Sequence, residues 1–354
     1  MRSRLATIYA VFCTLLLAGG FVLVFFFAGK TGQRESIEGI LGLAFGFIFA
    51  PIIHELGHVL FGCIAKMDCV FVKCFCFKVY YKDGKKRFSF VSPFAPDQTQ
   101  VLPKQGGNMQ KRASLYALGG LIFSGVFCFA LLASAILTAV LGAPSYLLFG
   151  LSVYTGYLFL LNLPPFAYAS GKTDMLVYIG IKKGYDAEKC MLSAMEIQGR
   201  LAEGKSYAEM EEDLYFHLPQ LCEDEPMYAV MLDLRYRYYL EKGDMENAAD
   251  CLNRLAFNEE YLPQTTVEGV AAELVYLHSL NGDFVSAERN AIVCQEYLKG
   301  DSVTAKRVLA AYSKACGRAE AVEVLLGQAK ELLPKERIVG VRKFEEILLS
   351  RISE

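Results

Sequence analysis

A His-Glu-Leu-Gly-His motif occupies residues 54–58, inside an apolar stretch that extends over residues 39–65. Histidines four positions apart lie on one face of a helix, so the imidazoles of His54 and His58 can bind the same Zn²⁺ ion. The carboxylate of Glu55 can act as a general base toward water at such a metal. Ionisable side chains inside a membrane helix are costly and rarely occur there without a partner or a function. The motif in this setting therefore predicts a catalytic zinc site.

A catalytic zinc site needs a third protein ligand, and Asp174 is the best-placed carboxylate. It is the only acidic residue between Asp97 and Asp186, and it follows two prolines at 164–165 that break a helix. Broken backbone at membrane depth is tolerated only where it is buried in protein or lines a polar cavity. Alternatively, Thr173 or Asp174 caps the helix that begins here, and both roles are compatible.

Composition divides the chain into two parts. Of its 354 residues 54% are hydrophobic, and the mean hydropathy is +0.30, which predicts membrane spans. Residues 1–182 carry 16 Lys and Arg against 7 Asp and Glu, whereas residues 183–354 carry 20 against 31. We therefore expect a membrane-embedded domain over residues 1–182 and an acidic helical domain over residues 185–354.

Four apolar segments reach the length of about 20 residues that a helix needs to cross a bilayer. They are residues 5–28, 39–65, 114–141 and 145–166. The loop 66–112 holds ten Lys and Arg, and further arginines precede the first span. Because cytoplasmic loops carry an excess of positive charge, we expect the N-terminus, this loop and the C-terminal domain in the cytoplasm. The predicted fold is mainly α, a polytopic membrane core of four or more spans followed by a helical repeat domain.

The membrane part resembles the site-2 protease family of intramembrane zinc metalloproteases, over roughly residues 35–182. Three features carry the resemblance: HELGH within a membrane helix, a later helix that ends in an Asn-x-x-Pro break at Asn162, and an aspartate, Asp174, shortly afterwards. The spacing from Asn162 to Asp174 is twelve residues, longer than in the family's pattern, and Met175 stands where that pattern has Gly. The small residues Gly119-Gly120 and Ser124-Gly125 are similar to a stretch of the family's middle helix, and close helix packing also explains them.

This resemblance implies a role for each residue of the site. His54, His58 and Asp174 would bind zinc, and Glu55 would be the catalytic glutamate. Asn162 would help to hold the substrate or the backbone of the active site.

The loop after the motif has the pattern of a small β-hairpin. Residues 69–81 are rich in β-branched and aromatic types, residues 82–85 form a turn signal, and residues 87–91 resume the pattern. Members of the resembled family place such strands near the active site, where an exposed edge could align an unwound substrate. A basic hairpin resting on anionic lipid headgroups explains the pattern equally well.

The C-terminal domain contains a weak repeat. Gly243, Gly282 and Gly317 each follow a similar apolar segment, at spacings of 39 and 35 residues. These spacings are near the tetratricopeptide period, in which glycine lies at the turn between two helices. We expect a tetratricopeptide-like array of helical hairpins over residues 185–354, which would bind a protein or peptide. A generic helical bundle is the alternative.

Together these patterns predict a zinc metallopeptidase that cleaves a membrane-spanning protein or peptide by regulated intramembrane proteolysis. Glu55 would take a proton from water and pass it to the leaving amine. The alternative is a catalytically inactive, membrane-anchored scaffold that binds through its helical repeats. The expected partners are the substrate, the lipid bilayer and a protein on the repeat domain, with no nucleic acid. We expect a multi-pass protein of a bacterial cell membrane.

Overall fold

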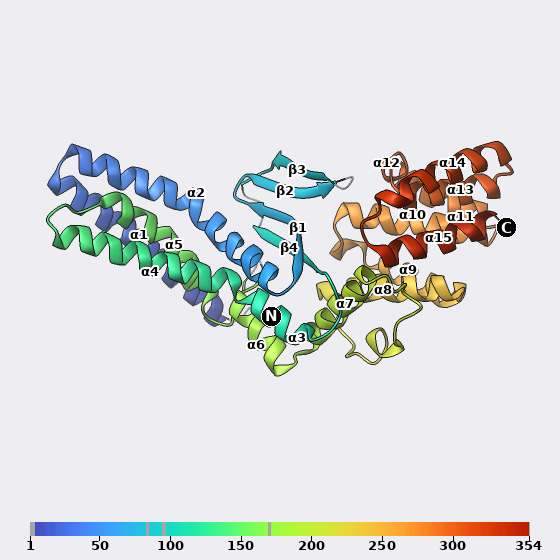
Figure 1. Cartoon of the computed structure of the whole chain (residues 1–354), viewed down its shortest axis with the longest axis horizontal. Coiled ribbons are helices and arrows are strands. Elements are labelled where there is room, and N and C mark those ends of the chain that lie inside the picture. The colour runs from blue at the N-terminus through green and yellow to red at the C-terminus, as the bar shows by residue number, and fades with distance from the viewer. Residues whose placement is uncertain (1–3, 83–84, 94–96, 169–170, 354) are drawn as a thin grey trace. The chain divides into compact units, whose positions relative to one another are not determined.

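A computed structural model describes residues 4–82, 85–93, 97–168 and 171–353 (Figure 1). The described chain is mainly helical, with a small antiparallel sheet. It divides into two compact units. The first comprises Met1–Leu102 and Asn108–Tyr185, and the second comprises Pro103–Gly107 and Asp186–Glu354. The short segment Pro103–Gly107 therefore belongs to the second unit, although the sequence analysis placed it in the loop of the first.

The first unit contains a bundle of apolar helices. Its helices are α1 (Arg4–Thr31), α2 (Gln33–Ile64), α3 (Met109–Ala117), α4 (Gly119–Val140), α5 (Tyr146–Asn162) and α6 (Asp174–Lys183). Among the described residues, three segments are long and apolar enough to span a membrane: Arg4–Thr31, Gln33–Ile64 and Met109–Val140. The fourth predicted span corresponds to α5, which is apolar but has only 17 residues. Helix α2 packs against α1, α4 and α5 (Figure 1).

Pairs of glycines bring α2 into backbone contact with two of its neighbours. A Cβ atom at Gly42 would lie 2.5 Å from the carbonyl oxygen of Leu147 in α5, and one at Gly57 would lie 2.4 Å from that of Gly119 in α4. Small residues allow this close approach of two helix backbones. Gly57 lies inside the motif, so it also fixes how closely α4 passes the two histidines.

A four-stranded sheet follows α2, where the sequence predicted only a hairpin. Its strands are β1 (Met67–Cys74), β2 (Phe77–Lys82), β3 (Lys85–Phe90) and β4 (Gln98–Pro103), in the order β3-β2-β1-β4. Strand β2 pairs antiparallel with both neighbours, placing Phe71 opposite Tyr80 and Phe77 opposite Phe90.

The predicted single strand over residues 69–81 is wrong, because the chain reverses within it. Phe75 has a φ of +52°, a left-handed conformation that ends β1 and lets β2 return beside it. The predicted turn between β2 and β3, at residues 83–84, lies outside the described residues. Strand β4 was missed because its sequence, Gln98 to Pro103, has too little hydrophobic alternation to signal a strand.

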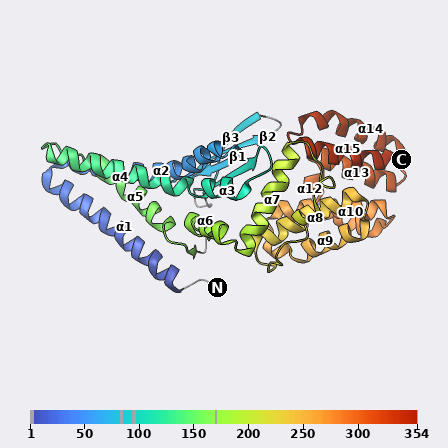
Figure 2. The same ribbon diagram turned by 60° about the horizontal axis from the view of Figure 1, so that its bottom comes forward.

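The second unit is built mostly from paired helices (Figure 2). Its helices are α7 (Asp186–Ala202), α8 (Pro226–Lys242), α9 (Met245–Phe257), α10 (Gln264–Leu280), α11 (Phe284–Val293), α12 (Gln295–Leu298), α13 (Val303–Ala315), α14 (Ala319–Leu332) and α15 (Val339–Ser353). Helices α8 and α9, α10 and α11, and α13 and α14 pack as consecutive pairs.

A glycine reverses the chain between the two helices of each pair. Gly243, Gly282 and Gly317 have φ values of 80°, 71° and 71°, which glycine adopts without steric cost. Asp244 and Asp283 follow the first two, and each accepts a hydrogen bond at 3.1 Å from a backbone N–H of the next helix. A Gly-Asp dipeptide thus ends one helix and caps the next.

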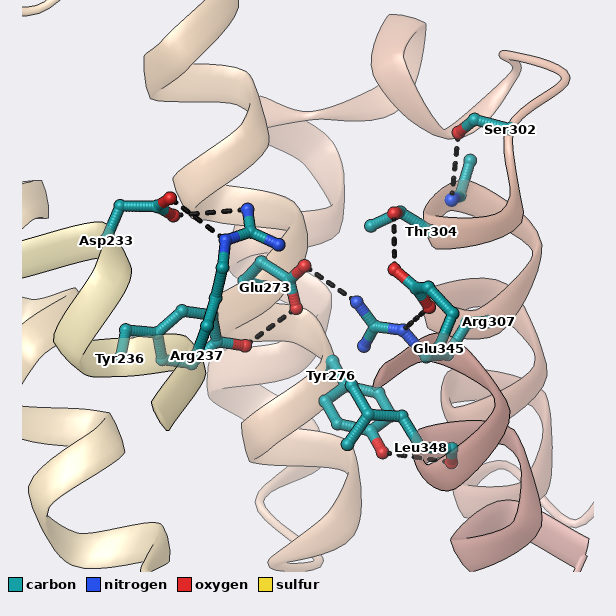
Figure 3. A network of polar contacts seen from close by, with 11 residues as sticks. Asp233, Tyr236, Arg237, Glu273, Tyr276, Ser302, Thr304, Arg307, Glu345 and Leu348 are labelled. Atoms are coloured by element: carbon teal, nitrogen blue, oxygen red, sulfur yellow. Dashed lines mark hydrogen bonds and ion pairs between the residues drawn. The ribbon is translucent and has the colours of Figure 1, made fainter. Parts of the chain in front are cut away.

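A buried ionic network joins four helices of the second unit (Figure 3). The Arg307 side chain is fully buried, and its guanidinium donates hydrogen bonds to Glu273 and Glu345, both at 2.7 Å. The Tyr236 hydroxyl donates to the second oxygen of Glu273 at 2.7 Å, and Thr304 donates to Glu345 at 2.8 Å. The network therefore links α8, α10, α13 and α15.

Replacing Glu273 by Gln should destabilise the second unit by about 3 kcal/mol, because it leaves Arg307 short of a buried counter-charge. Burial alone would raise the pKa of the Glu273 carboxyl, but the Arg307 and Arg237 guanidiniums outweigh it and hold that pKa below its usual value. The stabilisation from Glu273 is therefore complete above the unfolded-state pKa of about 4.3 and is lost as the pH falls through the lower folded-state pKa.

Hydrogen exchange of the α10 and α13 amides in the full-length protein measures this effect. Faster exchange in E273Q than in the wild type is expected, with a smaller dependence on acid pH. The exposed Glu320 provides a matched control as E320Q. Equal protection in E273Q and the wild type would show that the network is not stabilising.

Candidate metal centre

The structure brings three of the predicted site residues together. His54 and His58 lie one turn apart on α2, with ring centroids separated by 5.0 Å, and Asp174 is the first residue of α6. His54 Nε2 lies 3.4 Å from Asp174 Oδ2, and His58 Nε2 lies 3.4 Å from Asp174 Oδ1. The three side chains are at most 15% exposed. One donor atom from each lies within 4.8 Å of the others, so together they could hold one metal ion.

Each histidine faces a different oxygen of Asp174, and both separations of 3.4 Å exceed the length of about 2.7–2.9 Å of a charge-assisted N–H···O bond. The arrangement therefore leaves room for a cation between the two rings and the carboxylate. Asp174 Oδ2 is buried and has no hydrogen-bond partner among the described residues. Because a buried carboxylate oxygen without a hydrogen bond is costly, this donor set suits a cation.

Hydrogen bonds from the far side of each ring point the Nε2 atoms toward Asp174. His58 Nδ1 lies 3.0 Å from the Tyr116 carbonyl oxygen, which can only accept, so Nδ1 donates and Nε2 keeps its lone pair when the ring is neutral. His54 Nδ1 lies 3.0 Å from Ser124 Oγ, which fits the same tautomer. Histidine ligands of metals in proteins are commonly oriented in this way.

Thr173 presents Asp174 at the start of α6. Its hydroxyl accepts a hydrogen bond from Leu176 N at 3.2 Å, which caps the helix, and donates one to Pro164 O at 2.8 Å. The Thr173 side chain is buried. The two roles left open by the sequence are therefore divided: Thr173 caps the helix, and the Asp174 carboxylate faces the histidines.

The long spacing ahead of Asp174 is taken up by a two-stranded hairpin. Strands β5 (Ala167–Tyr168) and β6 (Gly171–Lys172) pair antiparallel, and the residues between them lie outside the described chain. Thr173 N donates to Phe166 O at 3.0 Å, so the chain returns close to the point where it left the proline break. The additional residues therefore do not carry Asp174 away from α2.

Asn162, the substrate-positioning residue implied by the resemblance, is not part of the group formed by His54, His58 and Asp174. It is the last residue of α5, and its Nδ2 atom donates to Leu158 O at 3.1 Å, one turn back in the same helix. Its role toward a substrate stays a prediction.

Glu55 is buried, and a strand that the sequence analysis missed holds its carboxylate. Thr99 in β4 donates from its hydroxyl to Glu55 Oε2 at 2.5 Å, and both side chains are less than 10% exposed. The Tyr116 hydroxyl donates to Thr99 O at 2.6 Å, fixing that part of the strand. No local pattern marks Thr99, because its importance arises only when β4 reaches α2.

Gly120 makes room for both imidazoles. A Cβ atom there would lie 2.4 Å from His58 Nε2 and 2.7 Å from His54 Nε2. Gly119, its neighbour, instead makes the backbone contact with Gly57. The small residues that the sequence assigned to helix packing thus serve packing at Gly119 and leave space for the two Nε2 atoms at Gly120.

No protein-family model matches the chain, and neither a curated protein nor a solved structure does. The functional interpretation therefore depends on the motif and on the arrangement of these side chains.

If His54, His58 and Asp174 hold zinc, replacing Gly120 by Ala should weaken its binding by about tenfold or more, the loss that disturbed support of metal ligands typically causes. The added methyl group would occupy the space of the two Nε2 atoms. Zinc content of the purified protein, followed by competition with a chelator, measures the effect. Gly19→Ala in α1 is the matched control, since no atom lies within 4 Å of its added Cβ. Unchanged zinc affinity in G120A would rule out a metal at this position.

Proposed function

We propose that the chain is a zinc-dependent intramembrane endopeptidase. The observation that carries the proposal is the convergence of His54, His58 and Asp174, with the buried Glu55 in the same helix, which is apolar enough to span a membrane. Structural zinc sites are almost always closed by four protein ligands, whereas catalytic sites use three and leave one position for water or substrate. Three donors beside a glutamate favour the catalytic class.

In this proposal the bound zinc would activate water and the scissile carbonyl group, and Glu55 would transfer the proton. When bound, zinc would polarise the carbonyl group of the scissile bond and make water more acidic. Glu55 is the group that takes the proton from water and transfers it to the leaving amine. Because Thr99 holds Glu55 Oε2, Oε1 is the oxygen left to carry the proton.

The position of the motif along α2 supports access of water to the site. Helix α2 has 32 residues and is about 48 Å long, whereas the hydrocarbon core is about 30 Å thick. His58 lies six residues before the helix end at Ile64, a rise of about 9 Å. By the charge of the following loop, this end would face the cytoplasm.

Strand β4 could align the substrate. It is an edge strand of the sheet, and its Thr99 contacts the proposed base. A peptide bond within a helix must be unwound before it can be cleaved, and a strand edge can bind the extended segment through backbone hydrogen bonds. The substrate class is accordingly a membrane-spanning protein or peptide.

The second unit would recruit a protein partner or the substrate's cytoplasmic tail. Its consecutive helix pairs, with glycine turns at similar spacing, support a tetratricopeptide-like array, and such arrays present extended binding surfaces. Both units would then serve regulated intramembrane proteolysis in a multi-pass protein of a bacterial cell membrane.

Glu55→Gln should lower the rate of cleavage by about 10²–10⁴-fold, because it removes the general base. Zinc binding should persist, because all three ligands remain. Comparing the membrane proteomes of cells that carry wild-type or E55Q protein should reveal one or a few accumulating substrates. Glu38→Gln is the matched control, since Glu38 lies in the same helix and pairs only with the exposed Arg34 among the described residues.

Two results would overturn the enzymatic proposal. One is wild-type protein, folded and purified, that binds no stoichiometric zinc. The other is an unchanged proteome in E55Q while deletion of residues 186–354 gives a phenotype, which would indicate a membrane-anchored scaffold.

Thr99→Val should lower kcat by about 10–100-fold, the effect of losing one hydrogen bond to a charged group. Zinc stoichiometry should stay unchanged, because Thr99 contacts no metal-facing atom. Thr99→Ser retains the hydroxyl and should restore most of the activity. If T99V and T99S cleave the substrate equally well, the hydrogen bond has no role in positioning Glu55.

A further inference from the structure

The second unit contains a cavity of about 320 Å³ that no part of the proposed proteolysis uses. Its buried residues are Cys190 from α7 and Tyr228 and Met231 from α8. The segment before α8 closes one side with Phe216, Leu218 and Leu221. The cavity volume is at the lower end of the range for ligand sites, about 300–1,000 Å³, so it suits a group the size of one or two amino acids.

Two arginines are among the residues that line this cavity, and the structure holds both in place. Arg235 of α8 donates from Nε to Tyr215 O at 2.7 Å, and its guanidinium lies 5.8 Å from the centre of the Phe216 ring. Arg254 of α9 donates from Nη2 to the Tyr228 hydroxyl at 2.8 Å. These bonds leave N–H donors on each guanidinium unused, since each has five.

Neither arginine is fully neutralised by the protein. Arg235 forms no ion pair with any described carboxylate, and no acidic residue lines the cavity. Arg254 lies 3.8 Å from Asp250, but both side chains are substantially exposed, so this pair is weak. Two cations beside aromatic and aliphatic side chains, in an otherwise acidic domain, are an arrangement for binding an anion that also carries an apolar group.

We propose that this cavity binds the C-terminal residue of a peptide, with the α-carboxylate on Arg235 and Arg254 and an aliphatic side chain over Cys190 and Met231. In a C-terminal residue, the carboxylate and the apolar side chain are attached to the same carbon atom. Both groups can therefore enter one small cavity together. An internal Asp or Glu has its carboxylate at the end of its own side chain, and its apolar neighbours point elsewhere.

The surroundings also select against simple anions. The acidic residues Glu223, Asp224 and Glu225 lie just beyond Leu221 in sequence, and their charge opposes the binding of any anion, so an inorganic anion that makes no apolar contact gains little there. Only a ligand that adds apolar contact to the paired carboxylate would bind well. The proposal concerns the second unit and is independent of the zinc site.

The test uses full-length protein in nanodiscs and a fluorescein-labelled hexapeptide ending in Leu-Leu with a free carboxylate. Fluorescence anisotropy should show saturable binding that weakens at least about tenfold when the same peptide is amidated, because charge-assisted hydrogen bonds are lost. A hexapeptide with an internal Asp and an amidated C-terminus, and inorganic phosphate as competitor, should bind no better than the amide.

Arg235→Gln should weaken binding of the acid peptide about tenfold or more while leaving the amide unchanged. Arg289→Gln on α11 removes the same charge from an exposed position outside the cavity and is the matched control. If R235Q fails to fold, Arg254→Gln tests the second cation. The proposal is overturned if acid and amide peptides bind equally, if neither binds at millimolar concentration, or if the internal-Asp peptide binds best.

Discussion

The first unit depends on one electrostatic constraint: two imidazoles and a carboxylate meet inside a largely apolar bundle. Asp174 Oδ2 is buried with no hydrogen-bond partner among the described residues, and the Nε2 atoms of His54 and His58 face this carboxylate. Such a group is stable in an apolar setting only when a cation or protons compensate its charge. The outward hydrogen bond of His58 to a carbonyl oxygen keeps its Nε2 lone pair directed inward, and the contact between His54 and Ser124 is compatible with the same tautomer, which favours the cation.

The surrounding elements satisfy this constraint in different ways. The contact of Gly57 with Gly119 brings α4 against α2, and the absence of a side chain at Gly120 leaves the space that the Nε2 atoms use. The Thr173 hydroxyl links the proline break to the start of α6, because it donates a hydrogen bond to Pro164 O and accepts one from Leu176 N. The second unit also contains a buried charge, Arg307, but two buried glutamates of the protein itself neutralise it.

The grouping of His54, His58 and Asp174 could be predicted because their chemistry is local or unusual, while their binding of a metal stays a prediction. The two histidines share a helical face, and Asp174 is an isolated carboxylate in an apolar region. Sequence reasoning could not find Thr99, whose contact with Glu55 depends on a strand 44 residues away in sequence. The reversal at Phe75 was also hidden, because a left-handed aromatic residue leaves no signal in a run of strand-forming types. Contacts between residues far apart in sequence, and the backbone conformation of a single residue, therefore could not be predicted from the sequence.

His54, His58 and Asp174 are held by two separate elements. The two histidines belong to one continuous helix, α2, which is in direct backbone contact with α4, whereas Asp174 is the first residue of α6, which the Thr173 hydroxyl caps. A shift of the start of α6 relative to α2 would therefore move one donor and leave the other two in place. The affinity for an ion bound by all three would then report the position of α6, and a molecule that displaces this helix would release the ion without unfolding the bundle.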